Sequence, residues 1–132
     1  MNAIKHIATG AASAACLATL ALSVTTVSAD ARGSDDVIRQ GSCSGSADWK
    51  LKVKTDDGRL EVEGEVDSNV NGQSWGWVLK HNGSVTARGT SRTVAPSGSF
   101  DVARRVVDLA GTDRIVFKAT HNGQVCRGVV NY

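Results

Sequence analysis

The closing stretch of the chain reads Arg114-Ile-Val-Phe-Lys-Ala-Thr-His-Asn-Gly-Gln-Val-Cys-Arg-Gly-Val-Val-Asn-Tyr132. Its centre, Asn122-Gly123, separates two runs rich in β-formers. Asn-Gly is the strongest short signal for a hairpin, because both residues of a type I′ turn need positive φ. A two-residue turn pairs Phe117 with Gly128 and places Cys126 on the same apolar face, which we assign to the core. The stretch therefore predicts a hairpin that buries the late cysteine.

A second hairpin is predicted nearer the start. Both Trp49-Lys-Leu-Lys-Val-Lys54 and Leu60-Glu-Val-Glu-Gly-Glu-Val66 alternate apolar and polar residues, which is the period of a half-buried strand. An Asp57-Gly58 turn between them sets Lys54 opposite Glu61 on the solvent face. A slip of one residue would place lysines against apolar side chains, so the charge ladder and the core select the same register.

A third hairpin is predicted in residues 74–93, around an Asn82-Gly83 turn. With a two-residue turn, Trp75 and Trp77 share a face with Arg88, and the apolar residues do not sort onto one side. Either the tryptophans lie in the core and the following strand bulges away, or they are exposed around Arg88. The periodicity leaves both arrangements open.

The remaining strand signal runs from Ser99 to Leu109. Its alternation through Phe100 and Val102 breaks at Arg104-Arg105, where we expect a β-bulge to restore the apolar side. The chain then has seven predicted strands and no helical pattern after its N-terminal leader. This pattern predicts an all-β protein, a seven-stranded antiparallel immunoglobulin-like sandwich that follows an N-terminal signal helix.

The N-terminus predicts export. Lys5 precedes an Ala/Leu/Val-rich run, and Val27-Ser28-Ala29 is a small-residue cleavage site, so residues 1–29 are expected to be a signal peptide. A membrane-spanning helix is the alternative interpretation of the same run. Residues 30–42 are polar and aperiodic, and we expect a flexible lead-in there. Residues 43–132 are then the sandwich domain.

Two cysteines remain after cleavage, Cys43 and Cys126. An even count in an exported chain predicts one disulfide. It would close a loop of 84 residues (126 − 43 + 1), a constraint worth about 4 kcal/mol in the chain-entropy model. The spacing offers no metal-ligand pattern, and neither a metal nor a cofactor is expected.

Charge is distributed unevenly along the mature chain, whose net value is 14 − 13 = +1. Residues 30–73 carry six basic and ten acidic residues, and residues 74–132 carry eight basic and three acidic. This asymmetry is compatible with head-to-tail contacts, with an anionic ligand, or with two differently decorated solvent faces.

Catalytic chemistry is not predicted. A serine or cysteine nucleophile needs a neighbouring base and an orienting group. The only mature histidines, His81 and His121, lie beside hairpin turns at opposite ends of the predicted sandwich, where we interpret them as solvent-tolerant turn residues. We therefore expect no enzyme, no catalytic residue and no metal shared by the histidines.

Trp75, Trp77 and Arg88 are the sharpest candidates for ligand binding. Aromatic faces on a sheet stack on sugars or apolar ligands, and Arg over Trp adds a cation–π contact of roughly 0.5–2 kcal/mol. The alternative is that both indoles fill the core. A second candidate set for a polyanion comprises five basic residues: Arg104, Arg105, Arg114, Lys118 and Arg127. Because no aromatic residues are interleaved with them, a nucleic-acid partner is not expected.

Five segments carry a resemblance to a known group: Cys43-Ser-Gly-Ser-Ala-Asp-Trp-Lys-Leu-Lys52, Gly58-Arg-Leu-Glu-Val-Glu63, Val70-Asn-Gly-Gln-Ser-Trp75, Ala95-Pro-Ser-Gly-Ser-Phe100 and Cys126-Arg-Gly128. They resemble small secreted proteins of actinobacteria with unassigned function. The resemblance covers most of the mature chain. It implies an exported, single-domain protein of the immunoglobulin-like sandwich type, and it carries no functional residues.

The sequence as a whole predicts a secreted, extracellular, monomeric and non-catalytic module. It would act by binding or as a structural component, with an unknown protein, cell-surface or glycan partner and no membrane attachment after signal cleavage. One alternative is a carbohydrate or hydrophobic small-molecule binding protein that uses Trp75 and Trp77. The other is an extracellular enzyme inhibitor that presents the loop Asp67 to Gln73.

Overall fold

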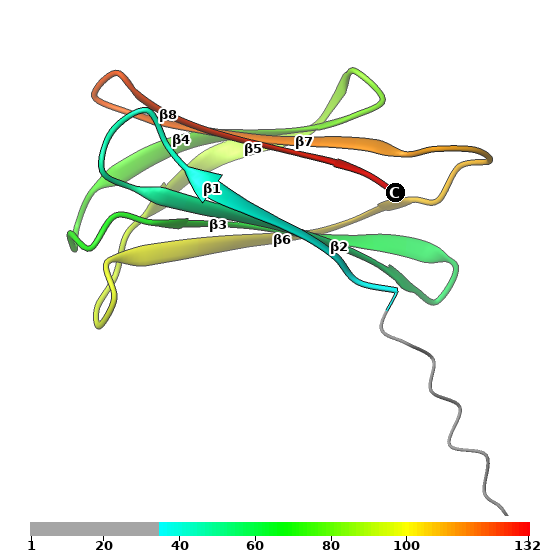
Figure 1. The fold of residues 1–132 in the computed structure, drawn as a ribbon, viewed down its shortest axis with the longest axis horizontal. Helices are drawn as coiled ribbons and strands as arrows, with labels where there is room; N and C mark the ends of the chain where they lie inside the picture. Colours follow the sequence, from blue (N-terminus) through cyan, green and yellow to red (C-terminus); the bar gives the residue numbers. More distant parts are fainter. Residues whose placement is uncertain (1–34) are drawn as a thin grey trace, which may run out of the picture. The chain divides into compact units, whose positions relative to one another are not determined.

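The computed structural model describes residues 35–132, in which eight β-strands follow one another (Figure 1). The strands are β1 (Val37–Ser42), β2 (Asp48–Asp56), β3 (Arg59–Asp67), β4 (Ser74–His81), β5 (Ser84–Arg92), β6 (Ser99–Val107), β7 (Arg114–His121) and β8 (Gln124–Asn131). The predicted signal peptide, residues 1–29, lies outside the described residues. Within residues 35–132, no helix is long and apolar enough to cross a membrane.

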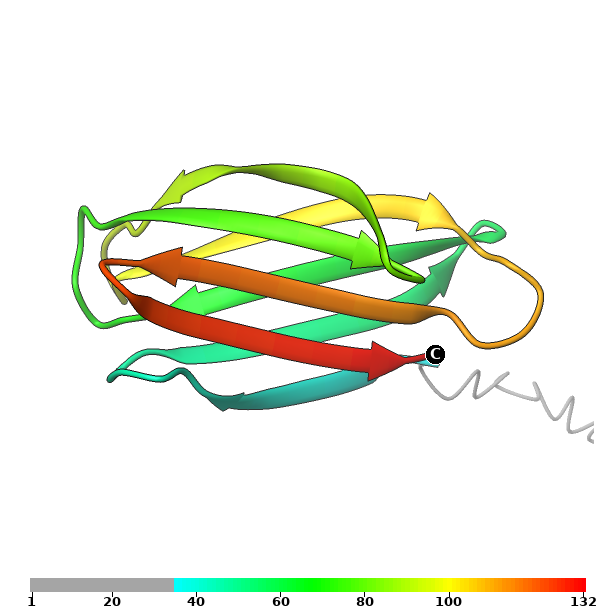
Figure 2. The same cartoon turned by 90° about the horizontal axis from the view of Figure 1, so that it is seen from above.

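The strands form two antiparallel four-stranded sheets that pack as a β-sandwich. One sheet has the order β1-β2-β3-β6, and the other has the order β5-β4-β7-β8. Figure 2 looks onto the second sheet, with the first behind it. The all-β antiparallel sandwich is confirmed, but the strand number is eight among the described residues and the prediction of seven is wrong.

The additional strand is β1, which lies where a flexible lead-in was predicted through Ser42. The prediction is wrong for Val37–Ser42, which pairs with β2 along its whole length. As an edge strand it has one neighbour in its sheet. Its buried side carries little apolar surface, because Arg39 and Gly41 alternate there with Val37, so the period-two signal is absent.

The β2–β3 hairpin has the predicted register, in which Lys54 faces Glu61. The Nζ atom of Lys54 lies 3.5 Å from the Glu61 carboxylate. Lys52 faces Glu63 in the register but forms its ion pair with Asp36, at 3.2 Å. The charge ladder therefore forms across β2 and β3 and extends to the residue before β1.

Two aromatic–glycine contacts join the sheets. Phe117 faces Gly128 within its own hairpin, as predicted, but its ring packs across the sandwich on Gly64 of β3, where a Cβ would lie 2.7 Å from the ring. In return, Trp49 of β2 packs on Gly128 of β8, where a Cβ would lie 2.5 Å from the ring. Each hairpin therefore supplies the glycine that receives the aromatic ring of the other, and both build one core.

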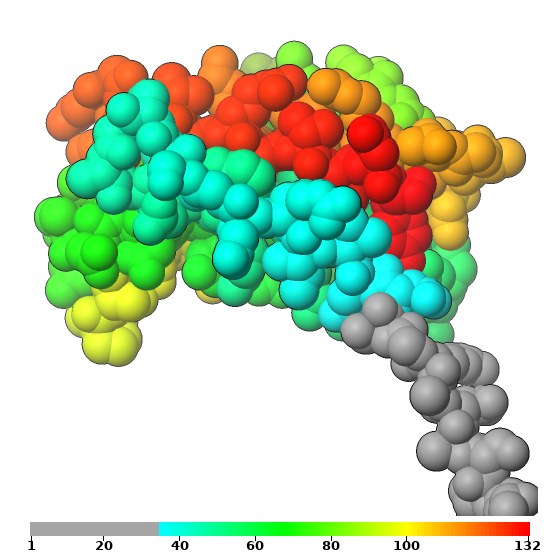
Figure 3. Space-filling view, in the orientation of Figure 1, coloured from blue at the N-terminus to red at the C-terminus, as the bar shows by residue number. Residues whose placement is uncertain are grey.

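A disulfide fastens the same pair of hairpins. Cys43 and Cys126 are bonded, as predicted. The amide of Ser44 donates to the carbonyl of Val125 at 2.8 Å, so the β1–β2 connection is also held by hydrogen bonds to β8. Figure 3 shows β1 and β8 lying against each other on this side of the sandwich. A disulfide of this kind suits an oxidising environment, as outside the cell.

The opposite side of the sandwich, between edge strands β5 and β6, is covered by Arg104. β6 pairs with β3 without interruption from Ser99 to Val107, so the bulge predicted at Arg104-Arg105 is wrong. The apolar residues at every second position of β6 point into the core, and Arg104 has the same phase. Its guanidinium carbon lies 5.1 Å from the centroid of the Trp77 ring. An inward charge at a sheet edge discourages pairing with another chain.

Candidate functional site

The β4–β5 hairpin contains a β-bulge where Leu79 is followed by Lys80. Near the turn the pairing is the predicted one, but beyond the bulge the register shifts by one residue and Trp77 faces Gly89. The shift places Ser91 and Gly89 opposite the two indoles, which face inward: Trp75 is 0% exposed and Trp77 is 5% exposed. Of the two arrangements that periodicity left open, the structure has the one with the tryptophans in the core.

The buried indoles are also satisfied as hydrogen-bond donors. Trp75 Nε1 donates to the side chain of Gln73 at 3.3 Å, and Trp77 Nε1 donates to Ser91 Oγ at 3.1 Å. Arg88 is exposed, and the alternation of β5 places it on the outer surface of the sheet. The structure therefore does not bring the three predicted ligand-binding residues onto one surface.

The outer face of the sheet β5-β4-β7-β8 is strongly basic. Its four strands contain six basic residues and no Asp or Glu, whereas the strands of the other sheet contain seven basic and seven acidic residues. The six are Lys80, Arg88, Arg92, Arg114, Lys118 and Arg127. They alternate with inward residues, so all project from the same side of the sheet.

Three of the five residues predicted for a polyanion lie on this basic face: Arg114, Lys118 and Arg127. Arg104 instead covers Trp77, and Arg105 pairs with Asp56 across the outer face of the other sheet. The hydrogen bond from Arg105 lowers the pKa of the Asp56 carboxyl from its ordinary value.

Two transverse rows of side chains cross the middle of the basic face. The row of small residues consists of Thr90, Gly76 and Thr120. The adjacent row consists of Arg88, Val78, Lys118 and Arg127. Cations and hydroxyls are thus spaced across the sheet at the distances between its strands, about 5 Å for each step.

These rows border two shallow hollows. The first has a volume of ≈ 460 Å³, and its floor is at Gly76 of the central strand β4. The second, ≈ 380 Å³, lies over Val78 and Val116 and is bordered by cations: Lys80, Arg114, Lys118 and Arg127. Lys118 borders both hollows, which makes them neighbours on one continuous surface.

The cations of the basic face have no counter-charge among the described residues. Within residues 35–132 the ion pairs involve Lys50, Lys52, Lys54, His81 and Arg105, and none of these belongs to the six. Uncompensated charge of one sign on a low-dielectric surface raises the local potential and concentrates ions of opposite sign. Chemically, this arrangement is suited to hold anions.

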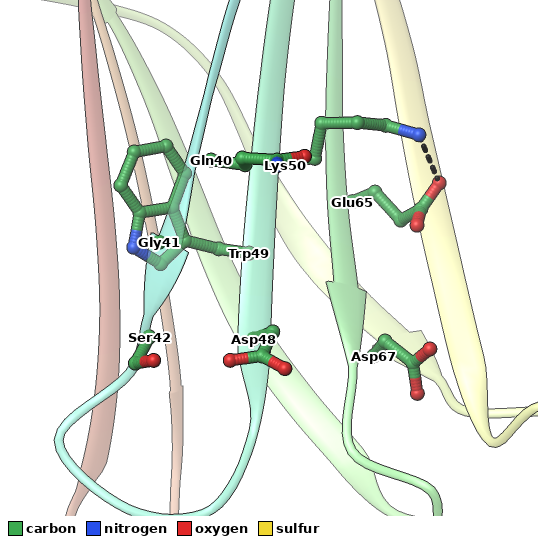
Figure 4. A pocket seen from close by; sticks show the side chains of 8 residues that line it. All are labelled: Gln40, Gly41, Ser42, Asp48, Trp49, Lys50, Glu65 and Asp67. Carbon is green, nitrogen blue, oxygen red and sulfur yellow. Dashed lines mark ion pairs between the residues drawn. The ribbon is translucent and has the colours of Figure 1, made fainter.

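A third hollow, of ≈ 500 Å³, lies at one end of the other sheet (Figure 4). Figure 4 shows two rows there: Gln40, Lys50 and Glu65, then Ser42, Asp48 and Asp67. Lys50 and Glu65 form an ion pair at 3.3 Å, whereas Asp48 directly faces Asp67. In the described part of the chain, no group of three or more His, Cys, Asp or Glu side chains is arranged to hold a metal ion.

The two histidines among the described residues lie at opposite ends of β4 and β7, as predicted. The interpretation of His81 as a solvent-tolerant residue is wrong, because its side chain is buried and its Nε2 lies 2.5 Å from Oδ1 of the buried Asp113. His121 Nδ1 lies 2.7 Å from the carbonyl oxygen of Ser74, and its ring stacks on Trp75. His81 therefore holds a loop residue against β4, and His121 holds the end of β7 against the start of β4.

The loop Asp67 to Gln73, predicted as a possible inhibitory loop, is braced from below by Thr93. The hydroxyl of Thr93 donates to the carbonyl of Val70 at 2.5 Å and accepts from the amide of Gln73 at 2.9 Å. Val70 itself is 49% exposed. The loop thus presents an apolar side chain on a hydrogen-bonded frame.

No protein-family model matches this chain, and comparisons with curated proteins and with solved structures give no match. The geometry and charge of the basic face are therefore the basis for its functional assignment.

Proposed function

We propose that the protein is a secreted, non-catalytic binding module that holds an anionic partner on the outer face of the sheet β5-β4-β7-β8. One observation carries this proposal: the four strands contain six basic residues, no acidic residue and, among the described residues, no ion pair at any of the six. Six like charges on one face repel each other, and an anionic partner relieves that repulsion.

Export is supported by the signal-like N-terminus of the sequence and by the Cys43–Cys126 disulfide. The resemblance to small secreted actinobacterial proteins points the same way. A partner outside the cell is then an extracellular or cell-surface polyanion, since such a polymer presents many charges to a flat surface.

The sandwich is of the immunoglobulin-like type. The order β8-β7-β4-β5 matches strands G-F-C-C′ of that fold, and the neighbours β2-β3-β6 match strands A-B-E. The strand β1 is then an addition outside strand A, and no described strand takes the position of strand D. Immunoglobulin-like domains are common carriers of binding surfaces, which supports a binding role by analogy of fold alone.

Binding to immobilised dextran sulfate tests the proposal. Replacing Lys80 and Lys118 with glutamine is expected to weaken binding by about tenfold or more, because two charges beside the same hollow contribute about 1.4 kcal/mol together. The matched control is Lys50→Gln with Lys52→Gln, which removes the same two charges from the other sheet and should leave affinity unchanged. High salt should release the unmodified protein.

Two outcomes contradict the proposal. One is the absence of binding by the unmodified protein at low salt. The other is an equal loss in the two double variants, which would show that net charge matters and the basic face does not. Circular dichroism of each variant verifies that the fold is retained.

A second candidate function, enzyme inhibition, is favoured by the braced loop that presents Val70. A rigid exposed loop lowers the entropic cost of occupying a protease cleft. Incubation with a panel of extracellular proteases tests it. Inhibition that Val70→Asp abolishes would support this function, whereas rapid cleavage within the loop without inhibition would exclude it.

A further inference from the structure

Four of the five glycines within the strands lie directly against an aromatic ring, and one does not. A side chain at each of four positions would meet an aromatic ring within 3.0 Å: Gly41 and Gly128 against Trp49, Gly64 against Phe117, and Gly89 against Trp77. Real Cβ atoms essentially never lie closer than 3.0 Å to such a ring, so packing requires glycine at Gly64, Gly89 and Gly128, and at Gly41 a side chain would be a tight fit. The fifth strand glycine is Gly76, in the central strand β4.

Packing does not require glycine at Gly76. A Cβ built there would meet only Thr120 Oγ1, at 3.8 Å, which is an ordinary contact. Its φ is also not positive, unlike that of the turn glycines. Glycine inside a strand costs about 0.5–1 kcal/mol relative to alanine. A glycine retained at such a cost often marks a place where a ligand approaches the backbone closely.

Four of the side chains around Gly76 are hydrogen-bond donors to anions. Arg88 and Thr90 come from β5, and Lys118 and Thr120 come from β7, so two equivalent pairs flank the central strand. Within the described residues, neither threonine hydroxyl is engaged in a hydrogen bond with the protein. An anionic group over Gly76 would receive charge-assisted hydrogen bonds from both cations, which are stronger than neutral ones.

We propose that the hollow over Gly76 is a subsite for one oxyanion group, a sulfate or a carboxylate, of an acidic polysaccharide. This inference rests on the proposed function and refines it. The adjoining hollow, where Lys118 is shared with Lys80, Arg114 and Arg127, takes a second anionic group of the same polymer. Two neighbouring cationic hollows on one surface match a polymer with a repeating charge rather than a lone ion.

The chemistry of the face favours a polysaccharide over other polyanions. The large aromatic side chains of this sheet, Trp75, Trp77 and Phe117, are buried, so nucleic-acid bases find no ring on which to stack. The apolar residues between the cations are valines, whose side chains are shorter than Lys and Arg. They cannot reach past the charges into a bilayer, as membrane-surface anchors do. Threonine hydroxyls suit the mixed hydroxyl and anionic groups of an acidic sugar.

The decisive variant is Gly76→Val, which fills the hollow without changing any charge. We expect it to fold with at least the stability of the unmodified protein, because β-branched residues favour strands. We expect its affinity for dextran sulfate and polygalacturonate to fall about tenfold or more, as an anionic group can no longer reach the floor between Arg88 and Lys118. Gly76→Ala should give a smaller loss and serves if valine disturbs the fold.

The matched control is Ser74→Val, which adds a similar side chain to the same outward face of β4. Ser74 lies outside both hollows of the basic face, so this variant should bind as the unmodified protein does. Isothermal titration with each polymer, and with inorganic sulfate alone, provides the affinities. Polymer should bind more tightly than the single ion at equal charge concentration.

The outcomes separate the subsite from the proposed function. Unchanged affinity in both Gly76 variants, together with loss in Lys80→Gln/Lys118→Gln, refutes the subsite and retains the basic face. Unchanged affinity in all of them refutes both. Tighter binding to single-stranded DNA or to anionic lipid vesicles than to either polysaccharide overturns the ligand class.

Discussion

Replacing Gly64 with alanine tests the reciprocal contacts that join the two hairpins. The new Cβ would lie 2.7 Å from the Phe117 ring, which is itself only 1% exposed. Overpacking of this kind costs about 1–3 kcal/mol. Replacing glycine also reduces the conformational entropy of the unfolded chain, and this effect stabilises the protein by about 0.4–1 kcal/mol. We therefore expect a net destabilisation of about 1–2 kcal/mol, or a Tm lower by about 5–15 °C for a domain of this size.

The matched substitution is Gly76→Ala, also in a central part of a strand, where the added methyl meets only Thr120 at 3.8 Å. It should be neutral or stabilising by up to about 1 kcal/mol. Guanidinium unfolding of the oxidised protein, followed by tryptophan fluorescence, measures both. Phe117→Leu should restore part of the stability in the Gly64→Ala background, with a coupling energy of about 0.5–3 kcal/mol.

The reasoning is refuted if Gly64→Ala proves as stable as Gly76→Ala. Equal stability would mean that the ring of Phe117 moves aside without loss, and that the cross-sheet contact does not specify glycine. Purely additive effects of Gly64→Ala and Phe117→Leu would lead to the same conclusion.

Three further substitutions probe the rest of the fold. Cys126→Ser should lower the free energy of unfolding by about 4 kcal/mol in guanidinium without reductant; reductant should reproduce the loss in the unmodified protein, and no difference would contradict the proposed constraint. Asp113→Ala leaves the buried His81 imidazole without its partner and should cost about 1–3 kcal/mol in thermal unfolding, so an unchanged Tm would show that this contact contributes nothing. The hydrogen bond from Arg105 holds the pKa of the Asp56 carboxyl below its ordinary value of 3.8. The ionised carboxylate therefore stabilises the fold at neutral pH, and this contribution is lost as the pH falls below 3.8 through the pKa of the folded state. In Arg105→Gln the pKa of Asp56, followed by NMR titration, should rise toward 3.8, and an unmoved pKa would contradict the assigned cause.

The first and last hairpins could be predicted with their registers because local signals agreed there. Asp57-Gly58 and Asn122-Gly123 fix a two-residue turn, and the alternation on both sides admits only one pairing that buries the apolar face. The disulfide followed from the count of cysteines. The exchange of partners across the sandwich could not be predicted, since a hairpin by itself does not say which aromatic ring of the other sheet will cover its glycine.

Other features depend on tertiary context. The edge strand Val37–Ser42 lacks the apolar alternation that would predict a strand, and it is a strand because it pairs with β2. In the sequence, the interruption of the apolar alternation at Arg104 indicated a bulge. In the structure the alternation of β6 continues, and Arg104 is an inward-facing residue that covers Trp77 at the edge of the sandwich. The burial of His81 depends on Asp113, which is thirty-two residues away in the chain.

The candidate site was visible in the sequence only as an excess of positive charge after residue 74. Assigning each basic residue to a face of the sandwich requires two facts that the composition does not contain. One is which strands share a sheet, and the other is which residues of β5 face outward after the bulge. The first separates Arg105 from Lys118, and the second turns Arg88 outward. The role proposed for Gly76 could not be predicted from the sequence, because the room for a side chain at this position depends on the packing of the neighbouring strands.

Because of the bulge after Leu79, the number of residues between the turn and Arg88 determines which side chains of β5 belong to the basic face. An edge strand exposed along most of its length ordinarily tolerates the loss or gain of a residue, because little packs on it. Here a single insertion between the Asn82-Gly83 turn and Arg88, with the register shift after Leu79 retained, would set Arg88 opposite Trp77 and exchange the β5 side chains that face the core with those that face the solvent. The spacing from the turn to Arg88 is thus as much a part of the basic face as the arginine itself.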